Sequence, residues 1–448
     1  AGRTRPPRMR RAALSAARLG RARLSSSSRP AQEYDVLVVG GGVMGASVAY
    51  HTALADPSLR VCVVERDTSY AHASAMLSAG GIRQQFSLPV NIQLSLYGVD
   101  FLRRLADELQ VPGSPPPDAQ FKEQGYLFLA SAQGEATLRR NQATQLAQGV
   151  SWTRLLSPDA LRRRFPWLNV DGVALGCVGE HSEGWFDPWA LLSALRAKAA
   201  HLGVRFVSAN VEGLEVAPEQ GGMRVRAARV RGAGGHEQAL GADTVVNAAG
   251  AFAADVVRLC GSSEQVAPLP VAARKRCVFG VHCDGAAAGA LPPHATTGLV
   301  VDPSGVWFRP EGAPGHFLCG VSPPEERGDP DCSGVAELEM VDHALFEEVI
   351  WPALYARCEA FGSLKVRSSW AGFYEYNSFD QNAIIGRHPH VPNMVLCNGF
   401  SGHGLQQSPA AGRAVAEIIT GREQTVDVSS LGFERVLRGE PVYEQNIV

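Results

Sequence analysis

The feature that most constrains this chain is an apolar run that ends in glycines and then continues as a helical stretch. Four apolar β-formers at 36–39 lead into glycines at 40, 41, 42 and 45. A strand joined to a helix by such a turn is typical of a dinucleotide-binding unit. Gly40 allows a tight turn, Gly42 lets the backbone approach a pyrophosphate, and Gly45 permits close packing of helix on strand. The pyrophosphate would lie at the helix N-terminus, where N–H groups and the dipole favour negative charge.

The residues that follow strengthen this interpretation. A helix is predicted to end near Asp56, and a second strand is predicted at Arg60–Glu65. Glu65 lies 20 residues beyond Gly45, where an acid that binds ribose hydroxyls is expected. The alternative is a strand–helix turn that binds nothing. This unit by itself is compatible with either NAD or FAD.

Length and charge limit the classes of protein to consider. A chain of 448 residues, 45% of them hydrophobic and 19% charged, suggests about two globular domains. No apolar run reaches about 18 residues, so no membrane-spanning helix is predicted. Residues 1–32 hold nine arginines and no acid; beyond them, 33 basic residues face 44 acidic ones, a formal charge of −11. An acidic body argues against a nucleic-acid partner.

The first 32 residues are predicted to be a mitochondrial transit peptide. They are rich in arginine, contain Ser15 and Ser25–Ser28, and lack a continuous apolar segment. The alternative is a disordered basic tail. The nine cysteines include no C-x-x-C pair, which predicts no metal site and suits a reducing compartment.

Further along, strands, glycine-rich turns and helices alternate. Residues 71–83 are small and show little helical or strand period. A buried strand at 243–250 ends in small residues, and a strand at 393–398 leads through a glycine-rich turn into a helix that ends at Thr420. Single helices are predicted at 88–109, 189–202, 251–260 and 342–361, strands at 125–130, 204–207, 276–283, 305–309 and 315–321, and a mobile loop at 322–334.

Segments 34–66, 71–83, 245–250 and 398–407 together resemble the D-amino-acid-oxidase-like flavoproteins, which include glycine oxidase, sarcosine oxidase and dimethylglycine dehydrogenase. The resemblance extends over about residues 33–435. It implies an α/β fold in which a discontinuous Rossmann-like FAD-binding domain carries an inserted antiparallel-sheet substrate domain. The expected bounds are 33–110, 186–264 and 372–448 for the FAD-binding domain, and 111–185 and 265–371 for the substrate domain, after the leader 1–32.

The resemblance also implies which residues bind FAD. It places the pyrophosphate on the first glycine turn, the adenosine on Glu65, Arg66 and Val211, and the flavin on the later segments. The full set is Gly40, Gly42, Gly45, Glu65, Arg66, Ser74, Ser78, Gly80, Val211, Ala249, Gly250, Gly402, His403, Gly404, Leu405 and Gln406. Ser74 and Ser78 are alternatively ordinary turn residues, and His403 a solvated loop histidine.

Two departures from the family pattern bear on the chemistry. Ser78 and Gly372 stand near the positions where relatives carry the histidine or cysteine that bonds FAD covalently, so non-covalent FAD is expected. The strand at 315–321 offers Phe317-Leu318-Cys319 where N-methyl amino acid oxidases carry a lysine important for reaction with oxygen. Transfer of electrons to another acceptor is therefore more plausible.

Substrate-binding residues are assigned only by resemblance. Family members pair a substrate carboxylate with an arginine, whose planar fork matches two oxygens. Arg309, in a segment like the family's Pro-Arg-turn-Gly, is the first candidate for the catalytic pocket, and Lys275, Arg83 and Tyr374 are others. Each is alternatively a solvated surface residue.

The function expected from the resemblance is oxidation of an amine or N-methyl amino acid. Residues 84–89, 184–189 and 402–407 carry a closer resemblance to a mitochondrial family member associated with assembly of respiratory complex I. That resemblance implies a matrix location, as a soluble protein or at the matrix face of the inner membrane, and complex I subunits or assembly factors as partners. The alternative is an assembly factor that retains FAD with little or no turnover.

Overall fold

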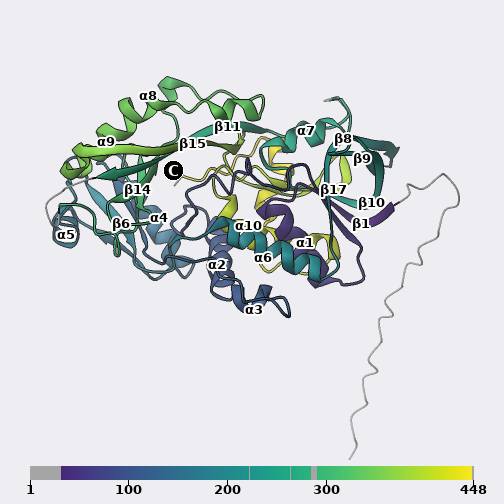
Figure 1. Ribbon diagram of the computed structural model, residues 1–448, viewed down its shortest axis with the longest axis horizontal. Coiled ribbons are helices and arrows are strands. Elements are labelled where there is room, and N and C mark those ends of the chain that lie inside the picture. The colour runs from purple at the N-terminus through teal and green to yellow at the C-terminus, as the bar shows by residue number, and fades with distance from the viewer. Residues whose placement is uncertain (1–31, 221, 263, 284–289, 446–448) are drawn as a thin grey trace, which may run out of the picture.

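Two large sheets, flanked by helices, lie side by side in the computed structural model (Figure 1). The structure describes residues 32–220, 222–262, 264–283 and 290–445. Residues 1–31, which hold nearly all of the predicted transit peptide, lie outside this part of the chain.

The first sheet has the parallel core expected of a nucleotide-binding domain. β1 lies between β2 and β10 and is parallel to both, which explains its continuous apolar run. β8 and β10 continue beyond this core and pair there with β9 in antiparallel register, an extension that the sequence did not indicate. The strands are β1 (Gln32–Val39), β2 (Val61–Glu65), β8 (Arg205–Glu219), β9 (Gly222–Gly232), β10 (Glu237–Asn247), β16 (Ile384–His388) and β17 (Val391–Asn398).

Helices cover both faces of this sheet. Those on one face share a core with β1 and β2, and they are α1 (Val43–Ala55), α2 (Pro89–Arg103), α6 (Pro188–His201) and α10 (Gly404–Thr420). On the other face, α7 (Ala253–Arg258) packs after the short 3-10 turn Gly250–Phe252. The prediction of one helix over 88–109 was wrong: Arg104 leaves the helical region at φ −99° and ψ 9°, and α3 (Leu105–Leu109) follows it.

The second sheet is antiparallel except where β12 runs parallel to β4. Its order is β15-β11-β14-β13-β12-β4-β6-β5. The strands are β4 (Tyr126–Ala130), β5 (Thr153–Leu156), β6 (Leu175–Gly179), β11 (Val271–Cys283), β12 (Leu299–Val301), β13 (Trp307–Pro310), β14 (His316–Gly320) and β15 (Leu364–Asn377). The family fold class is confirmed, although β15 continues past residue 371, where a domain boundary was predicted.

Helices over this sheet are short. The predicted helix at 342–361 is instead α8 (His343–Leu345), a π-helical turn at Phe346–Ile350, α9 (Trp351–Arg357) and a 3-10 turn at Glu359–Ser363. Pro352 in the first turn of α9 lacks the N–H that a continuous helix would need there. The remaining elements are β3 (Gly81–Ile82), which pairs with β7 (Gly184–Trp185), α4 (Glu135–Ala147), α5 (Pro158–Arg164), α11 (Glu434–Arg438), and 3-10 turns at Glu325–Arg327, Val335–Glu339 and Ser429–Leu431.

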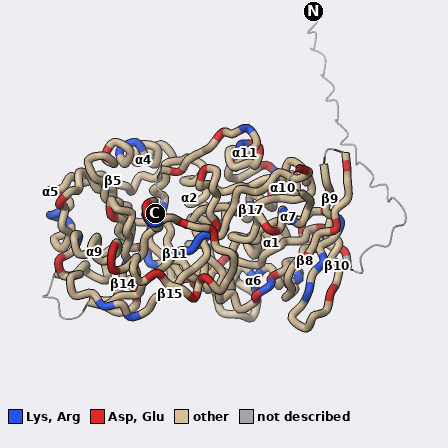
Figure 2. Tube along the Cα trace, turned by 90° about the horizontal axis from the view of Figure 1, so that it is seen from above, with Lys and Arg blue, Asp and Glu red and all other residues tan. Residues whose placement is uncertain are grey.

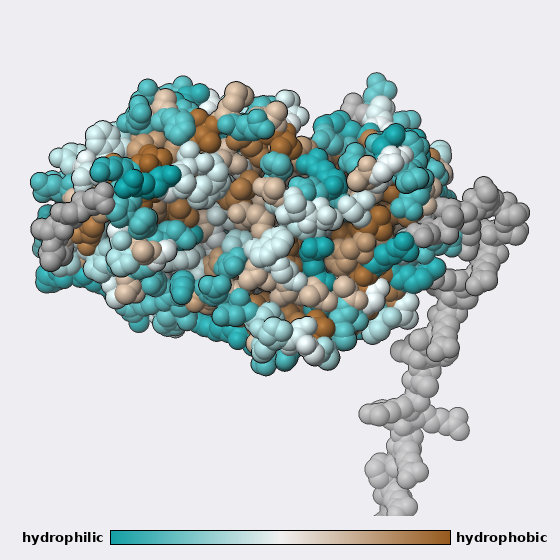
Figure 3. All heavy atoms as spheres, in the orientation of Figure 1, coloured by the Kyte–Doolittle hydropathy of each residue, from teal (hydrophilic) through white to brown (hydrophobic). Residues whose placement is uncertain are grey.

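The surface carries both charge signs over most elements, with basic and acidic residues interspersed (Figure 2). On the face shown in Figure 3, apolar residues lie in small areas separated by hydrophilic ones. Within the described residues no helix is long and apolar enough to cross a membrane. All nine cysteines are free, and all but Cys332 are buried.

Candidate functional site

A cavity of about 940 Å³ lies between the two sheets. The carboxyl ends of β1, β2 and β10 open into it from the first sheet, and β4, β11, β13 and β15 line it from the second. Such an edge is where α/β proteins bind their ligands. Every predicted FAD-binding residue lines this cavity except Gly45, which lies under the first turn.

The three glycines of the first turn have different reasons to be glycine. A Cβ on Gly40, at φ 97°, would lie 2.4 Å from the carbonyl oxygen of Ala248, and one on Gly45 would lie 1.8 Å from the carbonyl oxygen of Gly40. A Cβ on Gly42 would meet nothing within 4 Å, because it would point into the open cavity. The fold therefore requires Gly40 and Gly45, whereas Gly42 leaves room for an occupant at the start of α1.

The residues predicted to bind adenosine are grouped around Glu65 at one end of the cavity. One carboxylate oxygen of Glu65 accepts a hydrogen bond from the Gly41 amide at 2.7 Å, and the other accepts from the Asp67 amide at 2.8 Å. The carboxylate is thus fixed beside the turn at the edge of the cavity. Arg66 lies with its guanidinium carbon 4.0 Å from the centre of the Phe252 ring, and Val211 lines the same region.

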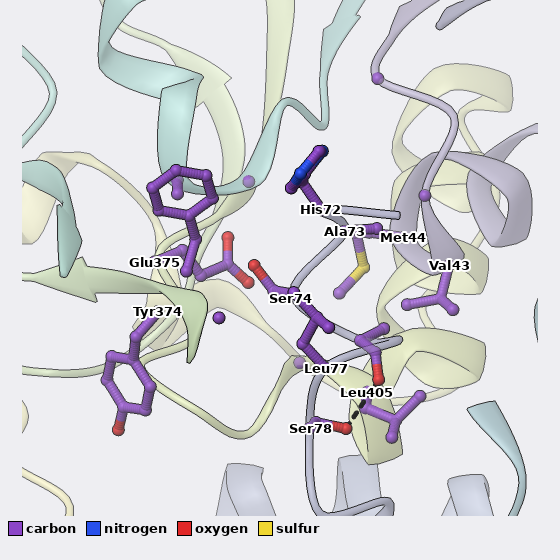
Figure 4. Close-up of a pocket in the computed structure, with 18 of the residues that line it drawn as sticks. Val43, Met44, His72, Ala73, Ser74, Leu77, Ser78, Tyr374, Glu375 and Leu405 are labelled. Atoms are coloured by element: carbon purple, nitrogen blue, oxygen red, sulfur yellow. Dashed lines mark hydrogen bonds between the residues drawn. The ribbon is translucent and has the colours of Figure 1, made fainter. Parts of the chain in front are cut away.

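At the other end, the N-terminus of α10 faces the cavity. His403 is its N-cap residue and forms no side-chain cap, and Gly404 and Leu405 line the wall. Ser74 points into the space between the two sheets (Figure 4). Ser78 has a turn role as well, since its hydroxyl donates to the Ala75 carbonyl at 2.7 Å and accepts from the Gly80 amide at 3.2 Å.

His403 is buried, so the solvated alternative was wrong. Burial, together with the neighbouring Arg83 guanidinium, holds the pKa of His403 well below its usual range. The imidazole is therefore neutral at physiological pH. Its Nε2 lies 3.5 Å from a guanidinium nitrogen of Arg83, and its ring meets Phe86 edge-on at 4.9 Å.

Of the four predicted substrate residues, the structure places Arg83 and Tyr374 in the cavity wall. The Arg83 amide donates to Oε1 of Gln406 at 2.8 Å, and its guanidinium lies 4.2 Å from the Phe86 ring centre. Burial lowers the pKa of Arg83, while two acids further off, Glu183 and Glu444, oppose that shift. This arginine is held by both the 81–86 segment and α10.

Arg309 and Lys275 do not line the cavity. The Arg309 guanidinium donates to the Ala79 carbonyl at 2.8 Å, pairs with Glu311 and lies over the Trp185 ring. Arg309 therefore holds the segment around Ala79 in place from outside the cavity. Lys275 donates from Nζ to the Met340 carbonyl at 2.9 Å, because its side chain leaves β11 on the face opposite to that of its neighbours in the wall.

Arg276, Tyr126 and Glu375 are among the wall residues that the sequence did not indicate. Arg276 lies on β11 with its guanidinium carbon 4.4 Å from the ring centre of Tyr374 on β15, and its nitrogens pair with Asp329 at 2.8 and 2.9 Å. These residues belong to no local motif. The pairing of β11 with β15 places the strand of Arg276 beside that of Tyr374 and Glu375. Tyr126 reaches the site separately, on β4, which pairs with β12.

A family model described as FAD dependent oxidoreductase matches residues 35–418. The chain belongs to this family of flavoenzymes. A relative named FAD-dependent oxidoreductase domain-containing protein 1, from Xenopus laevis, is 44% identical over 443 residues, which cover 94% of this chain and 86% of the relative. Human mitochondrial dimethylglycine dehydrogenase is 26% identical over 257 residues, covering 55% of this chain and 26% of that protein.

Solved structures agree on the fold of the FAD-dependent oxidoreductase. The L-proline dehydrogenase of P. horikoshii superposes with a TM-score of 0.75 at 23% identity, covering 92% of this chain and all of the other. The residues present fit FAD. Gly42 leaves a cradle at one end of α1, Glu65 offers an acceptor for hydroxyls, and α10 presents its N-terminus at the other end of the cavity.

Proposed function

We propose that this FAD-dependent oxidoreductase oxidises the carbon next to a secondary or N-methylated amine in a small substrate that carries a carboxylate. Bound FAD supplies the two-electron acceptor. The chain's own residues bind and orient the substrate, and in that role they need only align the reacting carbon. The observation that carries the proposal is a pair of arginines in the cavity wall, Arg83 and Arg276, the second of which lies against the Tyr374 ring.

The charges of Arg83 and Arg276 both affect the ionisation of Tyr374. Burial raises its pKa to about 12, and the charges of Arg276 and Arg83 each act to lower it. The phenol therefore stays protonated, and its hydroxyl donates to the Ser401 carbonyl. Asp329 offsets part of the charge of Arg276, and Arg83 adds a second guanidinium to the same cavity wall. A carboxylate is the group that planar guanidinium donors bind best.

A second proposal concerns the electron acceptor. Phe317, Leu318 and Cys319 occupy β14, where the family resemblance would place an oxygen-activating lysine, and all three are buried. Cys319 is fully inaccessible. We propose an acceptor other than oxygen, so reduced enzyme should reoxidise slowly in air.

Anaerobic mixing of purified enzyme with a panel of N-methyl amino acids and proline tests the proposal by loss of flavin absorbance. We expect at least one member to bleach the flavin, and Arg276→Gln to raise the concentration needed about tenfold or more, as expected for a lost charge-assisted contact. Arg274→Gln is the matched control, because Arg274 shares the Asp329 partner yet does not line the cavity. No bleaching by any compound would reject the oxidation proposal.

We propose that FAD is bound without a covalent link. Ser78 offers no nucleophile of the histidine type, and Gly372 lies against Leu77 with no side chain. Acid precipitation should leave the flavin in the supernatant. A yellow pellet would contradict this proposal.

We also propose a mitochondrial matrix location and a part in assembly of complex I. The arginine-rich leader and the resemblance of residues 84–89, 184–189 and 402–407 support this proposal. Residues 1–32 fused to a fluorescent protein should direct it to mitochondria. In cells lacking the protein, reduced levels of complex I should be restored by the wild type. Rescue by a flavin-free Gly42→Val variant would favour an assembly role that needs no turnover, whereas failure would tie assembly to FAD.

A further inference from the structure

The acid Glu375 on β15 lies in the cavity wall, and none of the functions described above uses it. Its carboxylate lies between two parts of the FAD site. A Cβ on Gly404, at the start of α10, would lie 3.0 Å from its Oε1, and a Cβ on Gly250 would lie 3.9 Å from its Oε2. Gly250 follows Ala248 and Ala249, which pack against Gly40 of the first turn. Glu375 therefore stands between the pyrophosphate turn and the helix that faces the flavin.

The backbone holds this carboxylate in place. Its Oε2 accepts a hydrogen bond from the Gly399 amide at 3.1 Å, and the Phe400 amide also donates to the carboxylate. Its own carbonyl accepts from the Ser401 amide at 3.1 Å. The side chain is half-buried because one side faces the cavity, opposite Ser74 in Figure 4. The acid is thus fixed with acceptor capacity directed at the occupant.

No cation neutralises the acid. Within the described residues Glu375 forms no ion pair. The elements packed against it present Ala273 on β11, the backbone of Gly250, Gly399 and Gly404, and the thiol of Cys397 on β17. Burial and the Glu375 carboxylate raise the pKa of Cys397 well above its usual range, so that thiol is neutral. A fixed carboxylate in such surroundings needs hydrogen-bond donors from its ligand.

We propose that Glu375 binds the ribityl chain of FAD, accepting a hydrogen bond from one of its hydroxyls. The ribityl chain is the part of FAD between pyrophosphate and flavin ring, and it offers hydroxyl donors where Glu375 lies. The burial of Glu375 gives the contact a pH signature, because it raises the pKa of this carboxyl to about 7 in the absence of the cofactor. A hydroxyl donor favours the ionised form. Binding of FAD therefore releases a proton below about pH 7.

Binding of FAD and of ADP to flavin-free protein, measured by calorimetry, tests the proposal without any turnover. ADP reaches only the pyrophosphate and adenosine residues. We expect Glu375→Gln to weaken FAD binding about tenfold or more, as for loss of a hydrogen bond to a charged group, and to leave ADP binding unchanged. Glu347→Gln, which removes an exposed charge from the same domain, is the control.

Two further measurements keep the test decisive even if the variant is unstable. The affinity of the wild type for FAD should rise as pH approaches 7 and level off above it. Calorimetry in buffers of different ionisation heat should also detect the proton that is released on binding. An FAD analogue lacking one ribityl hydroxyl should bind the wild type more weakly and the variant no worse than FAD. Three results would each overturn the assignment. In the variant, the affinities for FAD and ADP could fall equally, or the affinity for FAD could stay unchanged. Alternatively, every analogue could lose the same affinity in the variant as in the wild type.

Discussion

At the scale of single residues, the first turn separates two glycines that the fold needs, Gly40 and Gly45, from a third, Gly42, whose missing side chain only keeps the cavity open. Backbone oxygen atoms stand where a Cβ on Gly40 or Gly45 would lie, whereas empty cavity stands beyond Gly42. A sequence pattern treats the three alike. For Gly45 the obstacle is Gly40 in the same turn, whereas for Gly40 it is Ala248, directly after β10, whose position the turn itself does not encode.

Replacing Gly42 by valine should abolish FAD binding and leave the protein folded. The new side chain occupies the cradle at the N-terminus of α1 and collides with nothing else. Absorbance of bound flavin and the midpoint of urea unfolding of flavin-free protein measure the two effects. Gly45→Ala serves as the contrast, since it should lower the free energy of unfolding by about 2 kcal/mol or more through overpacking. A yellow, FAD-loaded Gly42→Val protein would refute the placement.

Glu375 should make the stability of the flavin-free protein depend on pH. The pKa of Glu375 is about 7 in the folded protein against an ordinary 4.5, so the native state keeps its proton longer than the unfolded state does. The free energy of unfolding therefore falls as pH rises from about 4.5 to 7. Glu375→Gln should remove up to about 3 kcal/mol of that fall. Parallel unfolding profiles of variant and wild type at pH 5 and pH 8 would contradict the assigned shift.

At the scale of elements, α2 depends on a residue remote in sequence. Its N-cap residue, Leu88, forms no side-chain cap. The buried Glu444 carboxylate instead accepts from the Ser87 amide at 2.7 Å, the Leu88 amide at 3.3 Å and Nδ2 of Asn91 at 3.0 Å. A negative charge at a helix N-terminus is also favourable to the dipole. The segment after α11 thus caps the N-terminus of α2, and α2 in turn packs on α10 beside the cavity.

Glu444→Ala should lower the free energy of unfolding by about 1–3 kcal/mol, because three donors lose their buried acceptor. Glu440→Ala is matched to it: Glu440 lies four residues earlier and pairs with Arg438 at an exposed site. That pair should contribute less than about 1 kcal/mol. Urea unfolding monitored by circular dichroism separates the two, and equal effects would argue against the capping role.

At the scale of the whole molecule, the cavity belongs to neither sheet alone, so FAD should stabilise both. Ligand at one hundred times its dissociation constant contributes about 2.7 kcal/mol to the free energy of unfolding. We expect FAD to slow amide hydrogen exchange in β1 and β2 and also in β11 and β15, whereas ADP should protect the first group alone. Protection limited to the first sheet under FAD would show that the cofactor does not span the cavity.

The sequence by itself determined the first strand-turn-helix and the family, and all but one of the residues it predicted to bind FAD line the cavity. These signals are local: a continuous apolar run, glycines at fixed spacing, and small residues where the backbone meets a flat ligand. Predictions that depend on a long helical period were less successful, because Arg104 interrupts the first helix and Cys358, at φ −146° and ψ 111°, leaves the helical region before the predicted end of the other.

Only the tertiary structure decided which charged residues face the cavity. Arg309 and Arg83 look alike in sequence, yet the first braces Ala79 behind the wall and the second lines the cavity. Arg276 and Glu375 reach the site because β11 pairs with β15 and β15 packs on the turn before α10. Contacts between strands about 100 residues apart leave no spacing in the sequence. Side-chain direction on those strands changes with every residue, and a pattern without register cannot supply it.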